Sequence, residues 1–495
     1  MKRIAVIGGG IAGLSAGVYA LLAGYDVTIY EKNADPGGEC MGWNRQGYHI
    51  DNCIHWLTGC NPGDDLYQIW CEIGALAQDT LLIREPYFYC LEMDGTTLHF
   101  WSDPERARKE FLDTAPEDAV EINRFFDCVR MAESVRVPCE KSLAEMKLGE
   151  YMKFGMSMAD MGRVIREYGK DTIDDLANRF GNPCVREMMR RYLNPACKAI
   201  TLLSSYAFYT SKTAAIPAGG SVGMVERIVS RYRELGGRIC TSMAAERVNV
   251  SHGKAQSVSF ADGSTVDCDY VVCATDPAVT FGGLLDPGYM DRKLRKMYAH
   301  PEGYKVFSLF GVSFGIRGKE NCADITGSIV FPCERFTVGT QKIDYLSARM
   351  YDYDKTLFPA DRRVIRCSIP QDSADYAYWN EIYHEKERYL EKKQEVAEAV
   401  RERLIRHFPV LQDRLILLDT YSPVTFTKWC GAYQGAYMSF FEQQGYKSLT
   451  VKNSIKGLSN VFLASQWLTT NGGLPMAVTS GKFAVQALLK QDGKK

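Results

Sequence analysis

The chain has 495 residues, of which 46% are hydrophobic, and its 59 basic and 60 acidic residues give a formal net charge of −1. This length is enough for two or three domains, and the balanced charge gives no indication of a nucleic-acid partner. No uncharged apolar run approaches the roughly 18 residues that span a bilayer, and the 16 cysteines include no Cys-x-x-Cys pair typical of zinc or iron–sulfur sites. We therefore expect an enzyme without a metal site, with reduced thiols, in the cytoplasm.

The first 31 residues predict a βαβ unit. An apolar strand over residues 2–7 is followed by a glycine turn over 8–13, a helix, and a second strand that ends at Glu31. In such a unit the first glycine permits the tight turn, the second lets a pyrophosphate approach the backbone, and the third lets the helix pack on the strand. The pyrophosphate lies at the helix N-terminus and the acid binds ribose hydroxyls. The predicted cofactor-binding residues of this unit are Gly8, Gly10, Ala12, Gly13, Glu31 and Lys32.

A second glycine turn, Pro36-Gly37-Gly38, directly follows the second strand. An NAD-binding domain has no particular need of this turn, whereas Gly37 and Gly38 can face the same diphosphate as the first turn. The alternative is an ordinary surface loop.

Two later segments have the pattern of further parts of the same domain. Residues 216–276 predict a helix over 222–235 and then short strands separated by glycine-containing turns, which is typical of a β-meander. Near the C-terminus, a buried strand over 460–464 is followed by a turn at Asn471-Gly472-Gly473 and a helix over 477–489. This turn predicts a second backbone contact to the cofactor, and a plain strand–turn–helix is the alternative.

The pattern from Ile4 to Gly38 resembles the FAD-binding fingerprint of the glutathione-reductase-like flavoproteins. Most of the chain resembles the phytoene desaturase and retinol saturase-like family, and the matching blocks are residues 47–56, 217–235, 246–250, 421–436 and 464–481. The resemblance implies FAD as cofactor, with Val248 at the adenine and Gln466, Gly472, Gly473 and Met476 at the flavin. The chain departs from the family where Glu39 replaces an arginine, Cys53 a glycine, and Ser465-Gln466 a Gly-Asp pair.

The resemblance also implies an α/β fold in which a Rossmann-type FAD-binding domain is built from discontinuous segments. We expect FAD-binding segments at 1–74, 216–276 and 420–495, interleaved with an α+β substrate domain from 75–215 and 277–419. The first substrate segment has helical character and contains five methionines between positions 146 and 161. These suit a substrate mouth, a membrane-facing patch, or core or lid packing. The second contains a long charged helix over 384–407 with one apolar stripe.

His55 and Tyr437 are the candidate catalytic residues. His55 belongs to the block that the resemblance brings to the flavin, although a structural histidine is the alternative, and Tyr437 lies in an aromatic run before the C-terminal block. The flavin would move a hydride to or from a carbon of a small, largely apolar substrate, so that a C=C bond is formed, saturated or isomerised. The alternatives are a flavin amine oxidase and an FAD-binding protein without turnover. The electron donor or acceptor is not indicated by the sequence, and peripheral contact with a membrane is left open.

Overall fold

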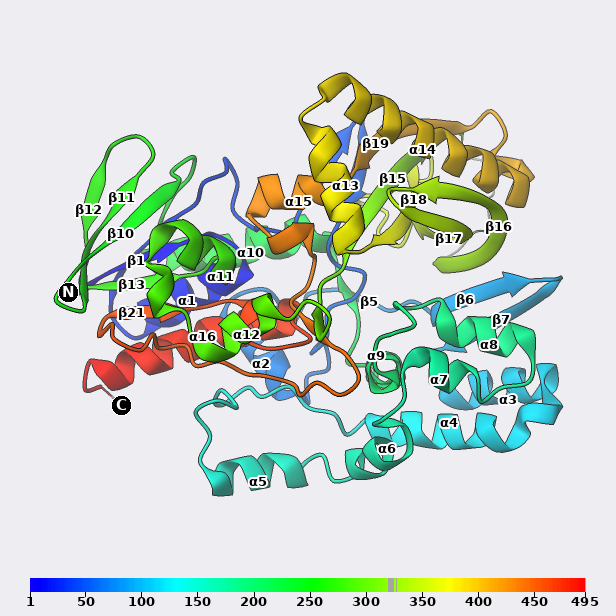
Figure 1. The fold of residues 1–495 in the computed structure, drawn as a ribbon, viewed down its shortest axis with the longest axis horizontal. Coiled ribbons are helices and arrows are strands. Elements are labelled where there is room, and N and C mark those ends of the chain that lie inside the picture. Colours follow the sequence, from blue (N-terminus) through cyan, green and yellow to red (C-terminus); the bar gives the residue numbers. More distant parts are fainter. Residues whose placement is uncertain (319–324, 326, 495) are drawn as a thin grey trace.

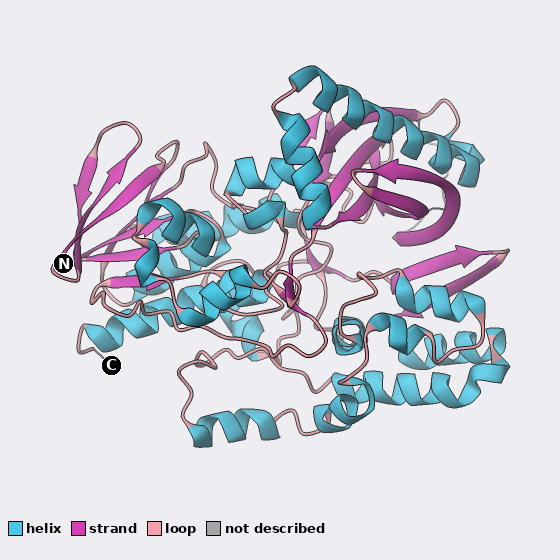
Figure 2. Cartoon of the chain, viewed as in Figure 1, coloured by secondary structure: helices cyan, strands magenta, loops and turns pink. Residues whose placement is uncertain are grey.

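The computed structural model describes residues 1–318, 325 and 327–494. Figure 1 shows both termini in one part of the molecule, around β1, while the long helix α14 (Lys386–His407) and a second sheet lie in another part. Figure 2 shows most of the strands in two separate groups with helices around and between them, and a few short strands between the groups.

The first group is a parallel five-stranded sheet with the order β21-β13-β1-β2-β9. Its central strand β1 (Arg3–Ile7) pairs on one side with β2 (Asp26–Tyr30) and on the other with β13 (Tyr270–Cys273). The outer strands are β9 (Arg238–Cys240) and β21 (Val461–Leu463). Three distant segments of the chain therefore form one sheet, which confirms the predicted α/β class.

Each face of this sheet is covered by a different layer. Ile4 and Val6 pack with α1 (Ile11–Leu22), α10 (Gly220–Glu234) and α16 (Leu474–Gln491). Ala5 and Ile7 point to the opposite face, as alternation along a strand requires. They pack with the meander of β10 (Ala245–Ser251), β11 (Lys254–Phe260) and β12 (Thr265–Asp267).

The second group is a seven-stranded sheet with the order β19-β15-β18-β17-β16-β6-β7. Its strands are β6 (Tyr87–Met93), β7 (Thr96–Trp101), β15 (Ser308–Ile316), β16 (Ser328–Val338), β17 (Gln341–Tyr351), β18 (Arg363–Gln371) and β19 (Leu415–Tyr421). One face is covered by α13 (Ser373–Tyr383) and α14 (Figure 1). The predicted stripe of α14 is buried there through Tyr389, Val396, Val400 and Leu404.

Strands β6 and β7 come from the segment for which the sequence analysis predicts helical character. Their hairpin turn, Asp94-Gly95, has positive φ at both residues and is a strong hairpin signal. Strand β6 pairs in parallel with β16 through Cys90 and Ile329. The first substrate segment is therefore mixed rather than helical, because its hairpin extends a sheet that the later segment begins.

The rest of the first substrate segment is helical. It contains α3 (Pro104–Thr114), α4 (Ala119–Ala132), α5 (Leu148–Met156), α6 (Met161–Tyr168), α7 (Ile173–Ala177), α8 (Pro183–Arg190) and α9 (Ala199–Thr210). The other helices are α2 (Asp65–Glu72), α11 (Pro277–Val279), α12 (Arg292–Ala299) and α15 (Pro423–Cys430). The other strands are β3 (Gly42–Arg45), β4 (Tyr48–Asp51), β5 (Leu82–Ile83), β8 (Ile216–Pro217), β14 (Tyr304–Lys305) and β20 (Phe441–Glu442).

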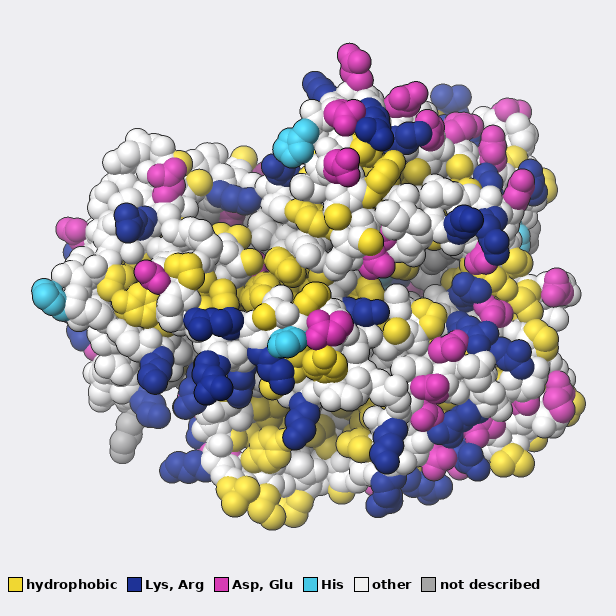
Figure 3. Space-filling model, in the orientation of Figure 1, with side chains coloured by type: hydrophobic (Ala, Val, Ile, Leu, Met, Phe, Trp, Pro, Cys, Tyr) yellow, Lys and Arg dark blue, Asp and Glu magenta, His cyan; other side chains and the backbone are white. Residues whose placement is uncertain are grey.

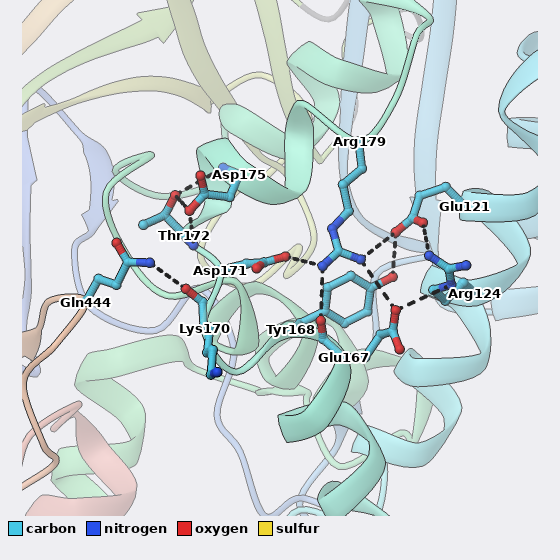
Figure 4. A network of polar contacts seen from close by, with 10 residues as sticks. All are labelled: Glu121, Arg124, Glu167, Tyr168, Lys170, Asp171, Thr172, Asp175, Arg179 and Gln444. Atoms are coloured by element: carbon cyan, nitrogen blue, oxygen red, sulfur yellow. Dashed lines mark hydrogen bonds and ion pairs between the residues drawn. The ribbon is translucent and has the colours of Figure 1, made fainter.

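An arginine just beyond α7 connects several of these helices. Figure 4 shows Arg179 among acidic groups and beside the ring of Tyr168. Its guanidinium lies 3.4 Å from Glu121 Oε1 of α4 and donates to the carbonyl of Glu167 in α6. Tyr168 also donates to Glu121, at 2.9 Å. This network fixes α4, α6 and α7 relative to one another.

None of the helices within the described ranges combines the length and the apolar character that crossing a bilayer requires.

Candidate functional site

A cavity of about 990 Å³ lies where the two sheets meet. On one side it is lined by the glycine turns after β1 and β2 and by residues 465–477. On the other side it is lined by α9 and by the face of the seven-stranded sheet that α13 and α14 leave uncovered. The segment 52–56 and the residues around Tyr437 lie between these two walls and also line the cavity.

The turn after β1 holds the N-terminus of α1 open to the cavity. A Cβ added at Gly10 would meet only Gly38 Cα, at 3.8 Å, so the space beside Gly10 belongs to the cavity. A Cβ at Gly13 would instead lie 2.0 Å from the carbonyl oxygen of Gly8. Gly13 therefore serves the packing of α1 on the strand, while the free N–H groups above it suit an anion such as a diphosphate.

The second turn lies directly against the first. The Gly37 N–H donates to the Gly9 carbonyl at 2.9 Å, and a Cβ at Gly38 would lie 3.2 Å from Gly10 Cα. Glu31, which is 5% exposed, accepts from the N–H groups of Gly9 at 2.7 Å and Asn33 at 2.9 Å. Its carboxylate thus fastens the first turn to the end of β2, beside the cavity.

The C-terminal turn provides a second helix N-terminus at the same cavity. Gly473 has a φ of +114°, in the region that favours glycine, and α16 begins immediately after it. The Gln466 side chain accepts from the Gly473 N–H at 2.6 Å and lies 3.4 Å from Glu39 Oε2 through its amide nitrogen. Gln466 therefore orders this turn by hydrogen bonds without adding a charge.

Most of the predicted site residues line this one cavity. They are Gly8, Gly10, Ala12, Glu31, Lys32, Gly37, Gly38, His55, Tyr437, Gln466, Gly472 and Gly473. Three do not: Gly13 lies beneath the turn, Met476 lies in the first turn of α16, and Val248 is buried within the meander, opposite Val258. The cavity wall is formed here by Met243, Ala244 and Ala245 at the start of β10, whereas Val248 points into the core shared by the meander and the parallel sheet.

His55 is held by an arginine that lies 311 positions later in the chain. Arg366 donates through Nη2 to His55 Nε2, and through Nη1 to the carbonyl oxygens of Asp51 and Asn52. Burial, with the charges of Arg366 and Arg349, holds the pKa of His55 well below its usual range. The imidazole is therefore neutral and accepts a hydrogen bond from Arg366 at Nε2. The catalytic role of His55 stays a prediction.

Tyr437 is half-buried and lines the cavity. Its backbone N–H donates to the Phe307 carbonyl at 3.3 Å, which holds this segment against the start of β15. Burial raises the pKa of the Tyr437 phenol above its ordinary value. The hydroxyl thus remains protonated at neutral pH and can donate a proton or a hydrogen bond.

Two acidic residues of the wall were not among the predicted site residues. Burial raises the pKa of Glu39 to about 8 and that of Asp276 to about 6. Asp276 is hydrogen-bonded by Tyr298 and by the backbone of Ala278 and Tyr433, whereas Glu39 lies next to Cys430 and Gln466. The departure from the family arginine at Glu39 was the sequence signal that this position is unusual.

The uncovered face of the seven-stranded sheet supplies a polar wall. Strand alternation places Ser347 and Arg349 of β17 and Arg366 and Ser368 of β18 on this face, and Arg349 lies directly opposite Arg366. Arg349 pairs with Glu85 at 2.6 Å. Nothing in the sequence showed that these strands would face the cavity, because the partner strands are far apart in the chain.

Comparisons with known proteins agree with this geometry. The family model "Flavin containing amine oxidoreductase" matches residues 11–489. The chain is similar to a lycopene-forming phytoene desaturase of Pseudescherichia vulneris, at 22% identity over 99% of both chains. It is also similar to a 4,4'-diaponeurosporene oxygenase of Staphylococcus aureus, at 19% identity over 100% of this chain and 99% of the relative. The solved structure of wild-type putrescine oxidase bound to putrescine has a TM-score of 0.63 at 14% identity, covering 100% of this chain and 99% of the other.

The cofactor is FAD, and the residues present fit it. The open cradle beside Gly10 and the two helix N-termini suit the diphosphate. The continuous cavity from Met243 to Gly473 gives room for an extended dinucleotide. Glu31, fixed by the backbone of the first turn, remains in the cavity wall for the ribose.

A matched pair of glycine variants distinguishes a loss of FAD binding from a loss of stability. We expect Gly10→Val to fold and melt near the wild type but to lose FAD, because its side chain enters the space beside the turn. Gly13→Ala should instead destabilise the protein by about 1–3 kcal/mol or more, because its Cβ meets the Gly8 carbonyl. The measurements are the FAD-to-protein ratio after loading and the melting temperature of the apoprotein. Wild-type FAD occupancy in Gly10→Val would contradict the assignment.

The affinity for FAD should fall as pH rises through about 8. Glu39 is neutral below its raised pKa and anionic above it, and the anion repels the diphosphate. We expect a dissociation constant that rises up to about tenfold per pH unit above that value, and a flat dependence for Glu39→Gln. The measurement is quenching of flavin fluorescence on titration of the apoprotein between pH 6 and pH 10.

Glu31→Ala is the comparison variant for that titration. It should weaken FAD binding by about 1.5–3 kcal/mol, since it removes charge-assisted hydrogen bonds. Its affinity for FAD should still fall above pH 8, because Glu39 is unchanged. A wild-type affinity that stays constant to pH 10 would show that Glu39 does not face the diphosphate.

Proposed function

Because the chain belongs to the flavin-containing amine oxidoreductase family, we propose that this FAD-dependent oxidoreductase forms, saturates or isomerises a C=C bond of a largely apolar substrate. The observation that carries the proposal is the composition of the cavity beyond the glycine turns. Aromatic and aliphatic side chains line it there: Trp56, Phe88, Phe208, Phe307, Met438 and Phe441. A relative of similar length is named a phytoene desaturase, which supports chemistry at a carbon–carbon bond.

The residues that line the cavity have separate roles in the proposed reaction. When bound, FAD supplies hydride transfer at the flavin N5. The aromatic wall binds the substrate and excludes water, which favours a hydride transfer over side reactions. Tyr437 holds a proton at its phenol oxygen beside the same cavity and is the proton donor when a bond is saturated. His55, neutral and fixed by Arg366, orients the reacting group.

An amine oxidase is the second candidate, because the family model and the putrescine oxidase fold point to it. The charges of the cavity wall oppose it. Arg349 is paired with Glu85, whereas Arg366 is buried in that wall without a carboxylate partner among the described residues, and a protonated amine next to it would be repelled. Hydrogen peroxide release with amines would favour this candidate over the first.

A patch on α5 supports peripheral contact with a membrane. No residue of this helix is buried, and Leu148 is 77% and Met156 69% exposed. With Tyr151 and Met152 they form what we call the apolar patch, and Figure 3 shows hydrophobic side chains and nearby lysines and arginines at this lower edge. Of the methionines noted in the sequence, Met161 is buried in the core instead.

An anaerobic screen of the holoenzyme tests the proposed activity. The oxidised flavin absorbance is followed while reductants and unsaturated lipids, terpenoids and amines are added. We expect flavin reduced by an external donor to be reoxidised by an unsaturated substrate, or oxidised flavin to be reduced by a saturated one. Tyr437→Phe should slow a saturation step by about 10²–10⁴-fold without loss of FAD. Tight FAD binding with neither a change in flavin absorbance nor conversion of any added compound would favour a binding protein without turnover.

Vesicle flotation tests the apolar patch. The double variant Met152→Glu/Met156→Glu should lose at least tenfold in binding to phospholipid vesicles, because each substitution removes apolar surface and adds a charge. Val120→Glu is the matched control: Val120 is 75% exposed but lies on α4. Equal flotation of the double variant and the wild type would place the membrane contact elsewhere.

A further inference from the structure

His55 lines the cavity, and only one of its two ring nitrogens has a partner among the described residues. Its Nε2 is occupied by Arg366, and the imidazole itself lines the cavity. An arginine side chain has only donors, so Nε2 must be the acceptor and the ring proton must lie on Nδ1. Within the described part of the chain no residue accepts a hydrogen bond from Nδ1, which leaves this N–H for a ligand.

The position of Arg366 allows only one neutral tautomer of the His55 imidazole. Arg366 is 1% exposed, and its guanidinium also donates to the carbonyl oxygens of Asp51, at 2.7 Å, and Asn52, at 3.2 Å. It therefore holds the segment that carries His55 as well as the ring. Arg366 has no ion pair to a carboxylate among the described residues, and Asp51, the acid whose charge acts on it, is hydrogen-bonded to Ser221. Its positive charge strengthens the Nδ1–H as a donor.

This arrangement suits an oxygen that gains negative charge during the reaction. A neutral imidazole can donate to a carbonyl oxygen without giving up its proton, and fixed donors of this kind stabilise developing oxyanions. A hydrocarbon beside the Nδ1–H would instead leave a buried donor unpaired, together with the hydroxyls of Ser347 and Ser368 in the same wall. The polar wall therefore selects against a substrate without oxygen.

We propose that the substrate is an apolar molecule whose reacting C=C bond is conjugated with a carbonyl group, and that His55 Nδ1–H binds the carbonyl oxygen. The hydrogen bond polarises the conjugated system, so that the carbon β to the carbonyl becomes electrophilic. Arg366 is the positioning residue, since it acts through the ring of His55. This substrate class rests on the proposed function but is tested by binding alone, without turnover.

The test uses the oxidised holoenzyme and two probes, β-ionone and the hydrocarbon of the same carbon skeleton without oxygen. Dissociation constants come from the change in flavin absorbance, and the ultraviolet band of β-ionone reports on hydrogen bonding to its carbonyl. We expect β-ionone to bind about tenfold more tightly than the hydrocarbon, with its band shifted to longer wavelength. Equal affinity, or an unshifted band in the bound state, would overturn the proposal in the wild-type protein without any variant.

Variants then locate the donor. His55→Leu should remove the preference and the band shift, whereas His55→Asn keeps an N–H near the position of Nδ1 and should retain part of both. Arg366→Gln should reduce the shift, because glutamine does not enforce the tautomer. Phe208→Leu, in the apolar wall, should weaken both probes alike.

Two outcomes count against His55. Retention of the band shift in His55→Leu would overturn the proposal. The proposal would also be overturned if His55→Leu changed the flavin spectrum without ligand and kept the preference for β-ionone. The His55 N–H would then bind the flavin and not the substrate. If the anaerobic screen finds no chemistry at C=C bonds while β-ionone still binds through His55, the proposed function fails and the carbonyl site stands.

Discussion

The close contact between the first glycine turn and the end of β13 is the constraint on which the site depends. A Cβ at Gly8 would lie 2.7 Å from the Ala274 carbonyl, and a Cβ at Gly13 would lie 3.1 Å from the Ala274 side chain. Only glycine lets the backbone of α1 come this close to two parallel strands. This contact positions the N-terminus of α1, the second glycine turn, and the hydrogen bond between the Gly9 N–H and Glu31.

The two sheets have separate roles at the cavity. The parallel sheet presents loops that follow its strands, so its contribution is mostly backbone N–H groups and glycine space. The seven-stranded sheet presents the side chains of one face, and its contribution is hydroxyl, guanidinium and aromatic groups. Cofactor binding therefore rests on chain geometry, while the choice of substrate rests on side-chain identity. Substitutions on the sheet face can change the substrate without disturbing the fold around the cofactor.

The sequence predicted the parts of the fold and site that are encoded locally. The spacing of Gly8, Gly10 and Gly13 before a helix, and the acid at Glu31, are short-range patterns with a direct mechanical meaning. The partner of His55 could not be predicted, since Arg366 is brought to it only by the packing of β18 against β4 and the segment that follows it. The addition of β6 to β16 was missed for the same reason, although the Asp94-Gly95 hairpin was visible. The Val248 side chain lies in the core and not at the cavity, because alternation along a strand decides which of the two a residue meets. Its contact with the adenine stays a prediction.

The parallel pairings also have a consequence for synthesis of the protein on the ribosome. Strand β1 requires β13, and through it β21, whose residues lie more than 450 positions after the start of the chain. Strand β6 likewise cannot pair with β16 until the chain has been made to residue 338 or beyond. Neither sheet can be completed while the chain is still short, and such long-range pairing is slow and leaves apolar surface exposed until it forms. The nascent chain therefore exposes apolar surface for most of its synthesis, and the cofactor site is complete only when α16, whose N-terminus lines it, has been made.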